Sequence, residues 1–416
     1  MIPKIREIRP SERELWRHVR LRALADTPDA FGETLADATA KDEAAWQQFV
    51  APRADAVRLL AERDGAPVGM CVLVVSADQR LANLYAMWVA PEARGAGIGR
   101  ALVEAALAWA RARAALEITL HVTQAPARRL YERCGFVDTG ERTPLRPGSP
   151  IGSEVMVARL PPLVMGIVNV TPDSFSDGGN YLAPTAAIDH GLALAAEGAD
   201  ILDIGGEATN PRAQPVDAGE ELRRVMPVVE GLAGHRLSID TTKAAVARAA
   251  VAAGASIIND VSGGLFDPDM AAAAGELGAL YIAGHLRGRS LPDVFAAEGA
   301  VPWQEVAVEL ARRVPAGPSW GDPGIGFGKG ADPEGNVALL RHAGDIAATI
   351  RRPVVVGPSR KRFLRRLLGG AQDPDITALD AASVLASIAA VRAGAQVVRV
   401  HNVALLRRGL TAYNKE

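Results

Sequence analysis

Three side chains in the second half of the chain could hold a flat substrate through its hydrogen-bond donors. Asp240, Asn259 and Asp322 lie in the motifs SIDTTK, INDVSGG and DPGIGFGK, and each follows a short apolar run. A carboxylate accepts two parallel N–H bonds with good geometry. A ring with a donor-rich edge is therefore the kind of substrate that these three side chains could bind.

A second group of side chains could bind an anion. Arg399 and His401 lie in the motif RVHNV, and Asn169 follows the apolar run LVMGIV. We expect these three residues to hold a diphosphate. A hard Mg²⁺ ion, bound through one oxygen ligand of Asn169 and through substrate phosphate, would complete the charge balance.

The apolar runs that precede these residues predict how they are positioned. Short candidate strands alternate with Ala-rich helical stretches, which is typical of parallel βαβ units. Eight such units match the size and period of a TIM barrel, where polar groups meet at the carboxyl ends of the strands. An open doubly wound sheet is the alternative. The candidate strands are 163–169, 200–205, 236–240, 256–260, 279–283, 318–322, 353–357 and 396–400.

A glycine-rich loop in the first half could bind a pyrophosphate. In WVAPEARGAGIGRALVEAALAWA, Arg94, Gly95, Gly97 and Gly99 lie between an apolar strand and an amphipathic helix. Glycines allow backbone N–H groups to approach phosphate oxygens, and the N-terminus of the helix adds a partial positive charge. The spacing differs from the Rossmann pattern, because the third glycine comes one residue early.

The context of this loop resembles the GNAT acetyltransferase superfamily over residues 4–158. The segments that carry the resemblance are MWVAP, RRLYERCGF and TPDAFGETLADATAKDEAAW. It implies that acetyl-CoA binds here, with Met87, Trp88 and Val89 pairing with the pantetheine arm and Tyr131 protonating the departing thiolate. Tyr131 could instead simply fill the core. The residues implied for the pyrophosphate are Arg94, Gly95, Gly97, Gly99 and Arg100.

The second half resembles dihydropteroate synthase over residues 161–405. The matching motifs, in order, are MGIVNVTPDSFSDGG, GGEATNP, SIDTTK, INDVSGG, HLRG, DPGIGFGK, GPSRKRFL and RVHNV. The resemblance implies transfer of a dihydropterin-methyl group from its diphosphate ester to the amine of p-aminobenzoate, which gives dihydropteroate for folate synthesis.

The resemblance also implies roles for individual residues. Asp240, Asn259, Asp322 and Lys361 bind the pterin, and Asn169, Arg399 and His401 hold diphosphate and Mg²⁺. Catalysis is then expected of Asp322, Lys361, Arg399 and His401, with Tyr131 in the first half. Taken singly, each residue has a plainer explanation as a helix cap, a turn residue or part of a solvated basic face. The expected surroundings of p-aminobenzoate are Thr209, Pro211, Phe327, Ser359 and Arg360.

Phe175, in the polar stretch NVTPDSFSDGG, is expected to be a lid residue of the first βα loop that becomes ordered only with ligands present.

Three features depart from the synthase pattern. Asn210 stands where Arg is usual, with Arg212 as the candidate replacement, and Asn402 stands where Asp is usual. The run RRVPAGPSWGDPG is short, which predicts an abbreviated helix or strand before Asp322.

Composition and length predict two domains, 1–160 and 161–416, in a chain of 416 residues that is 49% hydrophobic. The fold class is then α/β: a C-terminal TIM (β/α)8 barrel preceded by an α+β GNAT domain with a mixed, mostly antiparallel sheet. A net charge of -2 gives no reason to expect nucleic acid or a membrane surface as a partner. A homodimer through the barrel is implied by the synthase resemblance.

The cysteines and the hydropathy pattern indicate a cytoplasmic protein. Cys71 and Cys134 are the only cysteines, so a disulfide framework is not expected. No uncharged apolar run reaches the roughly 18 residues that a membrane span requires. The chain also begins with charged residues rather than with the apolar segment of a signal peptide.

The main hypothesis is a bifunctional enzyme, a dihydropteroate synthase with an appended N-acetyltransferase whose acceptor the sequence does not give. One alternative is a pterin-binding sensor or scaffold barrel, catalytically impaired and attached to an active acetyltransferase. Another is a pterin-binding methyltransferase. The segments TPDSFSDGG and SRK favour the synthase, because methyl transfer from a reduced folate needs no diphosphate site.

Overall fold

The computed structural model contains two compact units, Met1–Pro161 and Pro162–Glu416. It describes residues 3–77, 79–170, 183–209, 215–296, 299–329, 333–370 and 375–413. The expected lid residue Phe175 lies outside the described residues, as do Asn210, Pro211 and Arg212. Within the described ranges, no helix is long and apolar enough to cross a membrane.

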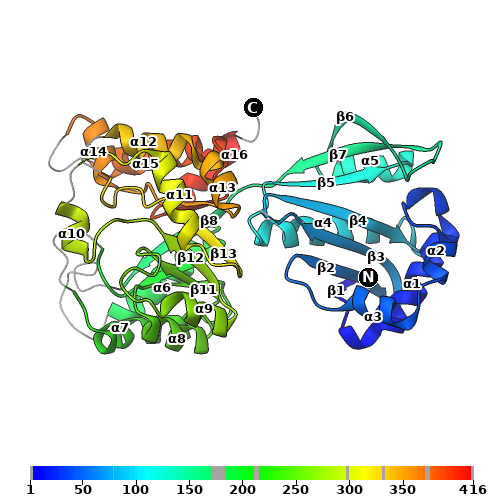
Figure 1. Cartoon of the computed structure of the whole chain (residues 1–416), viewed down its shortest axis with the longest axis horizontal. Coiled ribbons are helices and arrows are strands. Elements are labelled where there is room, and N and C mark those ends of the chain that lie inside the picture. The colour runs from blue at the N-terminus through cyan, green and yellow to red at the C-terminus, as the bar shows by residue number, and fades with distance from the viewer. Residues whose placement is uncertain are drawn as a thin grey trace. The chain divides into compact units, whose positions relative to one another are not determined.

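The N-terminal unit is built on one seven-stranded sheet in the order β1-β2-β3-β4-β5-β7-β6 (Figure 1). All neighbouring strands pair antiparallel except β4 and β5, which are parallel. The elements are β1 (Lys4–Glu7), η1 (Pro10–Glu12), α1 (Arg13–Asp26), η2 (Pro28–Ala30), α2 (Leu35–Thr39), α3 (Glu43–Val50), β2 (Ala56–Arg63), β3 (Ala66–Val75), β4 (Leu81–Val89), η3 (Pro91–Ala93), α4 (Ile98–Ala112), β5 (Glu117–Val122), α5 (Ala125–Arg133), β6 (Val137–Pro144) and β7 (Gly152–Arg159).

Helices on this sheet explain its apolar centre. Six consecutive residues of β3, from Val68 to Leu73, are buried, so both faces of the strand are covered. Helices α1 and α4 both contact β3. In α4 the buried residues recur at helical spacing on one face, which is the pattern of an amphipathic helix. They are Ile98, Leu102, Val103, Ala106 and Ala110.

The C-terminal unit is a barrel of eight parallel strands in the order β13-β12-β11-β10-β9-β8-β15-β14. A parallel bridge between Gly321 and Val354 joins the two end strands, and Gly321 N donates to Pro353 O at 2.9 Å. This closure excludes the open doubly wound sheet. The strands are β8 (Leu163–Asn169), β9 (Ile201–Gly205), β10 (Leu237–Asp240), β11 (Ile257–Asp260), β12 (Leu280–Gly284), β13 (Ser319–Asp322), β14 (Val355–Val356) and β15 (Val397–Val400).

Helices surround the barrel (Figure 1). They are α6 (Ala183–Ala196), α7 (Ala218–Gly231), α8 (Ala244–Ala252), α9 (Met270–Leu277), α10 (Leu291–Ala296), α11 (Trp303–Arg313), α12 (Pro333–Arg341), α13 (Ala343–Ile350), α14 (Arg362–Leu367), α15 (Ile376–Arg392) and α16 (Val403–Tyr413). Each of the eight predicted strands is present, and Val355–Val356 is much shorter than predicted. Before Asp322 the chain forms the eleven-residue helix α11 and the four-residue strand β13, and β10, β11 and β15 also have four residues. The expected shortening relative to other synthases stays a prediction.

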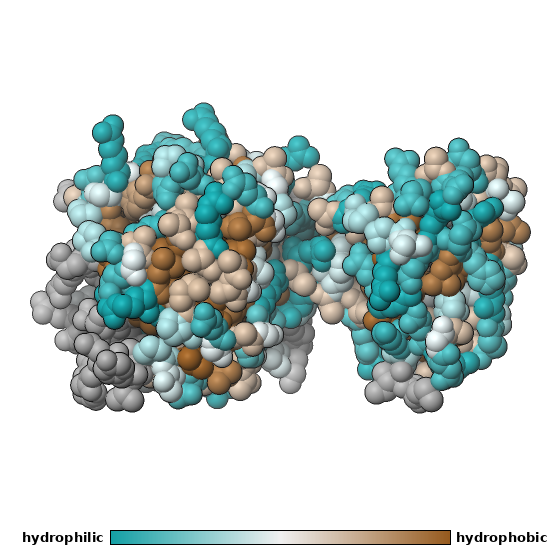
Figure 2. Space-filling model, turned by 90° about the horizontal axis from the view of Figure 1, so that it is seen from below, coloured by the Kyte–Doolittle hydropathy of each residue, from teal (hydrophilic) through white to brown (hydrophobic). Residues whose placement is uncertain are grey.

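Both units carry apolar side chains on their surfaces. Figure 2 shows hydrophobic residues gathered near the middle of one face of the barrel unit, between hydrophilic ones. Scattered exposed apolar side chains are normal for soluble domains, so they carry no functional conclusion by themselves. The most exposed large ones include Leu81, Tyr85 and Val137 in the first unit and Leu192, Leu367, Ile376 and Leu385 in the second.

Candidate active sites

Arg399 is held between two carboxylates at the carboxyl end of the barrel strands. Its Nε donates to Asp203 Oδ2 at 2.5 Å, and its Nη2 donates to Asp240 Oδ2 at 2.6 Å. Asn259 Nδ2 also donates to Asp203 Oδ2, at 3.1 Å. The side chain of Asp203 is completely buried, whereas that of Asp240 is 16% exposed. The cluster therefore fixes Arg399 and leaves Asp240 open toward the mouth of the barrel.

Burial controls the charges of this cluster. It raises the pKa of Asp240 to about 7, and Arg399 only partly opposes this effect. Burial alone would lower the pKa of Arg399, but the nearby carboxylates, Asp203 first, raise it overall. Arg399 is thus a permanent cation, while Asp240 can change its protonation state near neutral pH.

Asp322 is the last residue of β13, and Lys361 lies after β14 as the N-cap residue of α14. Lys361 Nζ lies 3.6 Å from the ring centre of Phe327, which is a close cation–π contact. Asp322 Oδ1 accepts a hydrogen bond from Gly324 N at 2.7 Å. Burial lowers the pKa of Lys361 to about 8 and raises that of Asp322, and the two charges attract each other.

His401 is fixed by the hydroxyl of Ser359. Ser359 Oγ accepts from His401 N at 3.2 Å and lies 2.9 Å from His401 Nδ1. The Ser359 hydroxyl can donate its proton to Nδ1, and in that tautomer the ring proton is on Nε2. Burial lowers the pKa of His401 to about 3, so the ring is neutral at pH 7. As a neutral ring, His401 would contribute an N–H donor rather than a positive charge to the predicted diphosphate site.

Arg360 is bound to Asp380. Its Nε and Nη2 donate to the two carboxylate oxygens at 2.7 and 3.0 Å, and Asn402 Nδ2 donates to the same carboxylate at 3.1 Å. Asn402 also caps α16 by accepting from Leu405 N. Asparagine at position 402 can donate to Asp380, whereas an aspartate would place two carboxylates together.

A cavity of about 1130 Å³ in the N-terminal unit brings the acetyl-CoA residues together. Strand β4 pairs with β5 only from Leu81 to Leu84, and its last residues diverge from β5. A bulge at Ala86, with φ 54°, accompanies this divergence. Predicted residues that line the cavity are Met87, Trp88, Val89, Arg94, Gly95, Gly97, Gly99, Arg100 and Tyr131.

The glycine loop has the backbone conformation that an anion site requires. Gly95 and Gly97 have φ of 80° and 79°, and Gly97 is the N-cap of α4. The two arginines have partners of their own: Arg94 bonds with Asp26, and Arg100 Nε donates to Glu104 Oε1 at 2.7 Å. The backbone therefore offers the main donors to a pyrophosphate.

Tyr131 lines the same cavity on α5. It is 6% exposed and packs against Phe136 with ring centres 5.7 Å apart. Burial raises the pKa of Tyr131 above its usual value, so the hydroxyl keeps its proton at neutral pH. The side chain thus packs in the core, as one of the two interpretations expected, and its role as the acid stays a prediction.

Comparison with known proteins identifies the barrel. The family model described as "Pterin binding enzyme" matches residues 165–401, more than half of the chain. The chain belongs to the pterin binding enzyme family. The model described as "Acetyltransferase (GNAT) family" matches residues 20–136.

Relatives of the pterin-binding barrel are dihydropteroate synthases. That of Mycobacterium leprae is 44% identical over 260 residues, which cover 58% of this chain and 89% of that protein. A mitochondrial folate synthesis bifunctional protein of Arabidopsis thaliana is 38% identical, and the match covers 61% of this chain and 49% of that protein. The solved Xanthomonas albilineans dihydropteroate synthase with 4-aminobenzoic acid has a TM-score of 0.55 and 42% identity, covering 61% of this chain and 93% of that one.

These findings confirm the predicted fold class and both family resemblances. Because the match extends over nearly the whole length of synthases, it favours a synthase over a non-catalytic pterin-binding barrel. The free thiols of Cys71 and Cys134 agree with the expected absence of a disulfide.

Asp203 and Lys329 are buried charged residues of the pterin-binding barrel that were not predicted from the sequence. Asp203 is the one acidic residue in the otherwise apolar strand ILDIG, and this contrast was the sequence signal that could have identified it. Lys329 is 1% exposed and donates to His285 O at 3.0 Å and Phe327 O at 2.9 Å. Burial lowers its pKa to about 7. Lys329 therefore holds the loop that presents Phe327.

Other polar residues at the strand ends have structural partners. Asp260 accepts from Tyr281 Oη at 2.8 Å and from Ser262 and Gly264. His285 contacts Glu309 at 3.0 Å. The carboxylate of Asp260 is thus satisfied by its neighbours, whereas the buried Nδ1 of His285 has no hydrogen-bond partner among the described residues. Asp240 and Asp322 each retain a carboxylate oxygen without a hydrogen-bond partner among the described residues.

Asn169 is the last residue of β8, and Thr209 lies in the loop after the neighbouring strand β9; segments outside the described residues begin at 171 and 210. Asn169 is exposed. In the described part of the chain, no group of three His, Cys, Asp or Glu side chains could hold a metal ion.

Proposed function

We propose that the pterin-binding barrel is a dihydropteroate synthase. It would join 6-hydroxymethyl-7,8-dihydropterin diphosphate to p-aminobenzoate: the C–O bond to diphosphate breaks, the amine nitrogen then forms a C–N bond to the methylene carbon, and the amine releases one proton. The observation that carries this proposal is the fixed cation Arg399 beside Asp240 at the barrel mouth, in a fold whose solved relatives bind 4-aminobenzoic acid and 7,8-dihydropteroate.

Free acceptor oxygens support recognition of the pterin. Asp240 Oδ1, Asp322 Oδ2 and Asn259 Oδ1 make no hydrogen bond within the described parts of the chain. The pterin edge carries ring and amino N–H groups, which are donors for such oxygens. Phe327, with Lys361 Nζ on its ring, gives a flat surface beside them.

The remaining residues would stabilise the leaving diphosphate. Electron donation from the pterin ring lets diphosphate depart before the amine arrives, so the barrel must stabilise separating charges rather than form a covalent bond. Arg399 is preorganised by Asp203 and Asp240, and His401 Nε2 offers a neutral donor. Asn169 with diphosphate oxygens would hold Mg²⁺, which would neutralise the charge of the leaving group.

Thr209, Phe327 and Ser359 are our proposed surroundings for p-aminobenzoate. Phe327 packs against Phe295 with ring centres 5.9 Å apart, which forms an apolar wall. Arg360 was expected here as well, but its Nε and Nη2 donate to Asp380. We propose that Arg360 shapes this loop rather than binding the carboxylate of p-aminobenzoate.

The N-terminal unit is a GNAT domain, and we propose that it transfers an acetyl group from acetyl-CoA to an amine. The diverging end of β4 would pair with the pantetheine arm through Met87 and Val89. The turn at Gly95 and Gly97 would bind the pyrophosphate, and Tyr131 would protonate the thiolate of CoA.

The decisive experiment incubates purified protein with dihydropterin-methyl diphosphate, p-aminobenzoate and Mg²⁺ and measures dihydropteroate. We expect product from the wild type and a loss of at least about 100-fold in kcat/KM for Asp322→Asn. Asp345→Asn, which changes an exposed carboxylate on α13, is the matched control and should have wild-type activity. Pterin binding without any product would overturn the synthase assignment.

A further inference from the structure

Arg360 adopts a backbone conformation that residues with a side chain rarely take. Its φ is 56°, in the left-handed region, where Cβ lies too close to the following carbonyl oxygen. Such values are common just after the end of a helix, but Arg360 lies in the loop between β14 and α14. The conformation is therefore sterically costly, and contacts with other elements must hold it.

Two side chains of α15 supply these contacts. Arg360 N donates to Ser383 Oγ at 2.9 Å, and its Nε and Nη2 donate to the two carboxylate oxygens of Asp380 at 2.7 and 3.0 Å. Asp380 and Ser383 are three positions apart, so they lie on one face of the helix. Both the backbone and the guanidinium of Arg360 are therefore fixed to the same element.

Asp380 is suited to holding a cation. Its side chain is 9% exposed, and Asn402 Nδ2 donates to its Oδ2 at 3.1 Å. Burial alone would raise the pKa of Asp380, but the hydrogen bonds from Arg360 and then from Asn402 lower it overall. The carboxylate is therefore ionised at neutral pH and offers both of its oxygens to Arg360.

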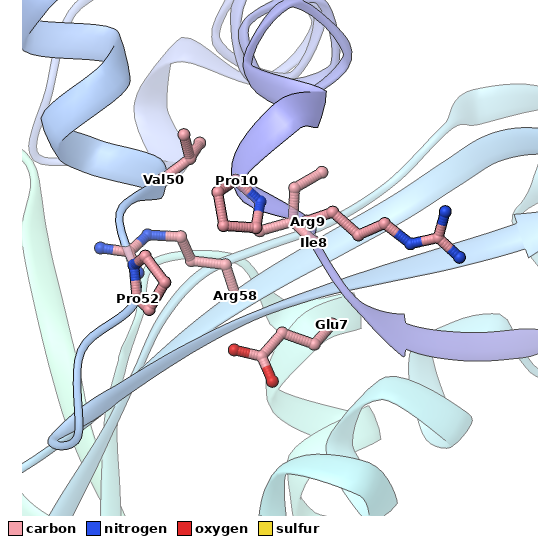
Figure 3. A pocket seen from close by; sticks show the side chains of 7 residues that line it. All are labelled: Glu7, Ile8, Arg9, Pro10, Val50, Pro52 and Arg58. Carbon is pink, nitrogen blue, oxygen red and sulfur yellow. The ribbon is translucent and has the colours of Figure 1, made fainter.

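Charge balance alone does not require this ion pair. The side chain of Arg360 is 33% exposed, so water can solvate its guanidinium. Arg58, in the N-terminal unit, is 6% exposed and forms no ion pair among the described residues, and it lines a cavity of about 260 Å³ (Figure 3). Glu7 lines that cavity too, but its register partner Leu59 places it on the opposite face of the sheet from Arg58. An arginine of this chain can thus lack a carboxylate partner, and the pair at Arg360 needs another explanation.

The neighbours of Arg360 in the sequence supply that explanation. Ser359 Oγ lies 2.9 Å from His401 Nδ1, and Lys361 Nζ lies 3.6 Å from the ring centre of Phe327. We expect both neighbours at the substrate site. Because the three residues are consecutive, a change of φ at Arg360 would turn Ser359 and Lys361 relative to each other. The conformation of Arg360 thus determines how these two side chains are oriented.

We propose that Asp380 is a positioning residue, which fixes Arg360 in its left-handed conformation and so places Ser359 and Lys361 for the substrate. Asp380 itself would not touch the substrate. Its effect on turnover rests on the proposed synthase function, whereas its effect on pterin affinity rests only on the contact of Lys361 with the pterin.

Asp380→Asn in the full chain tests this role, because asparagine keeps the size of the side chain and removes its charge. Calorimetry with 6-hydroxymethylpterin gives the Kd of the pterin, and steady-state synthase kinetics give kcat. We expect the Kd to rise about fivefold and kcat to fall about tenfold, since small displacements of groups that position a substrate are costly.

A double-mutant cycle with Arg360→Gly shows whether Asp380 acts through Arg360. Glycine takes a positive φ without a steric penalty and has no guanidinium, so the carboxylate loses its partner. In this background Asp380→Asn should change the pterin Kd and kcat less than about twofold. Asp375→Ala, which removes the N-cap hydrogen bond of α15 from Thr377 N at 3.0 Å, is the matched control and should keep the wild-type Kd and kcat.

Wild-type values of the pterin Kd and kcat in Asp380→Asn would overturn the positioning role. An undiminished effect of Asp380→Asn in the Arg360→Gly background would overturn it as well. If Asp380→Asn fails to fold, Ser383→Ala removes the acceptor of Arg360 N and should raise the pterin Kd about threefold, and an unchanged Kd would count against the proposal. A wild type that binds the pterin without forming dihydropteroate would refute the synthase assignment, and the pterin Kd would still decide the role of Asp380.

Discussion

Substitution of Asp203 tests whether this buried carboxylate, for which we propose no contact with substrate, holds Arg399 in position. Asp203 Oδ2 accepts from Arg399 Nε at 2.5 Å and from Asn259 Nδ2 at 3.1 Å, while its Oδ1 is buried without a partner among the described residues. In Asp203→Asn the amide oxygen can take the place of Oδ2. Both hydrogen bonds then remain, but their acceptor is neutral.

The size of the effect follows from these two bonds. A hydrogen bond to a charged group contributes about 1.5–3 kcal/mol and a neutral one about 1 kcal/mol. Loss of the charge should therefore lower the free energy of unfolding by about 2 kcal/mol. Asp203→Leu removes the acceptor of both hydrogen bonds and leaves Arg399 paired with Asp240 alone. We therefore expect this substitution to lower the free energy of unfolding by about 3–5 kcal/mol.

Two measurements separate positioning from stability. Urea denaturation of the full chain gives the change in unfolding free energy, and steady-state synthase kinetics give kcat and KM separately. We expect kcat to fall about tenfold in Asp203→Asn and at least about 100-fold in Asp203→Leu, with smaller changes in KM, because Arg399 would stabilise the leaving group. Asp345→Asn is the control. A loss of stability with unchanged kcat would refute the positioning role, and wild-type values of both would refute the whole argument.

Three other predictions concern pH, a buried hydrogen bond and the glycine loop. An aspartate ordinarily has a pKa of 3.8, and burial raises that of Asp240 to about 7. The contribution of the Asp240 proton to the free energy of unfolding is therefore full below about pH 4 and is lost as pH rises through about 7. The affinity for pterin, which the ionised form binds, should instead weaken as pH falls below about 7. Titration of kcat/KM should show this acid limb, and Asp240→Asn should remove it. Tyr281→Phe should lower the unfolding free energy by about 1.5–3 kcal/mol in urea denaturation, because Asp260 loses a charged hydrogen bond, and kcat should stay unchanged; a fall in kcat would contradict our structural role for this pair. Gly97→Ala should lower the free energy of unfolding by about 1 kcal/mol and weaken acetyl-CoA binding in calorimetry. Gly65→Ala, at the same φ of 79°, should lower the free energy of unfolding equally and leave acetyl-CoA binding unchanged. Equal losses of acetyl-CoA binding in the two variants would contradict a phosphate role for the loop.

Local sequence was enough to predict the strands and the groups at their carboxyl ends. An apolar run followed by Asp240, Asn259 or Asp322 predicts both a buried parallel strand and a polar residue beyond it. Because all strands of a barrel point the same way, their ends meet at one rim. The glycine loop was predictable for a similar reason, since Gly95 and Gly97 adopt a conformation that other residues rarely take.

Pairings across the barrel could not be predicted in this way. Asp203 lies 196 positions before Arg399, and Arg360 bonds with Asp380. His401 retains its expected place, but burial makes it a neutral donor. Such outcomes depend on which charges approach each other after folding, and on how much water remains around them.

The sequence by itself determined the order of the elements, the glycine turn and the set of polar groups at the barrel rim, because steric preferences and apolar periodicity act between near neighbours. The tertiary structure alone decided that the barrel closes between Gly321 and Val354, that Arg399 is held by two acids, and that Arg58 is buried without an ion-pair partner in the described residues. The physical reason is that burial and charge pairing are properties of residues brought together from distant parts of the chain.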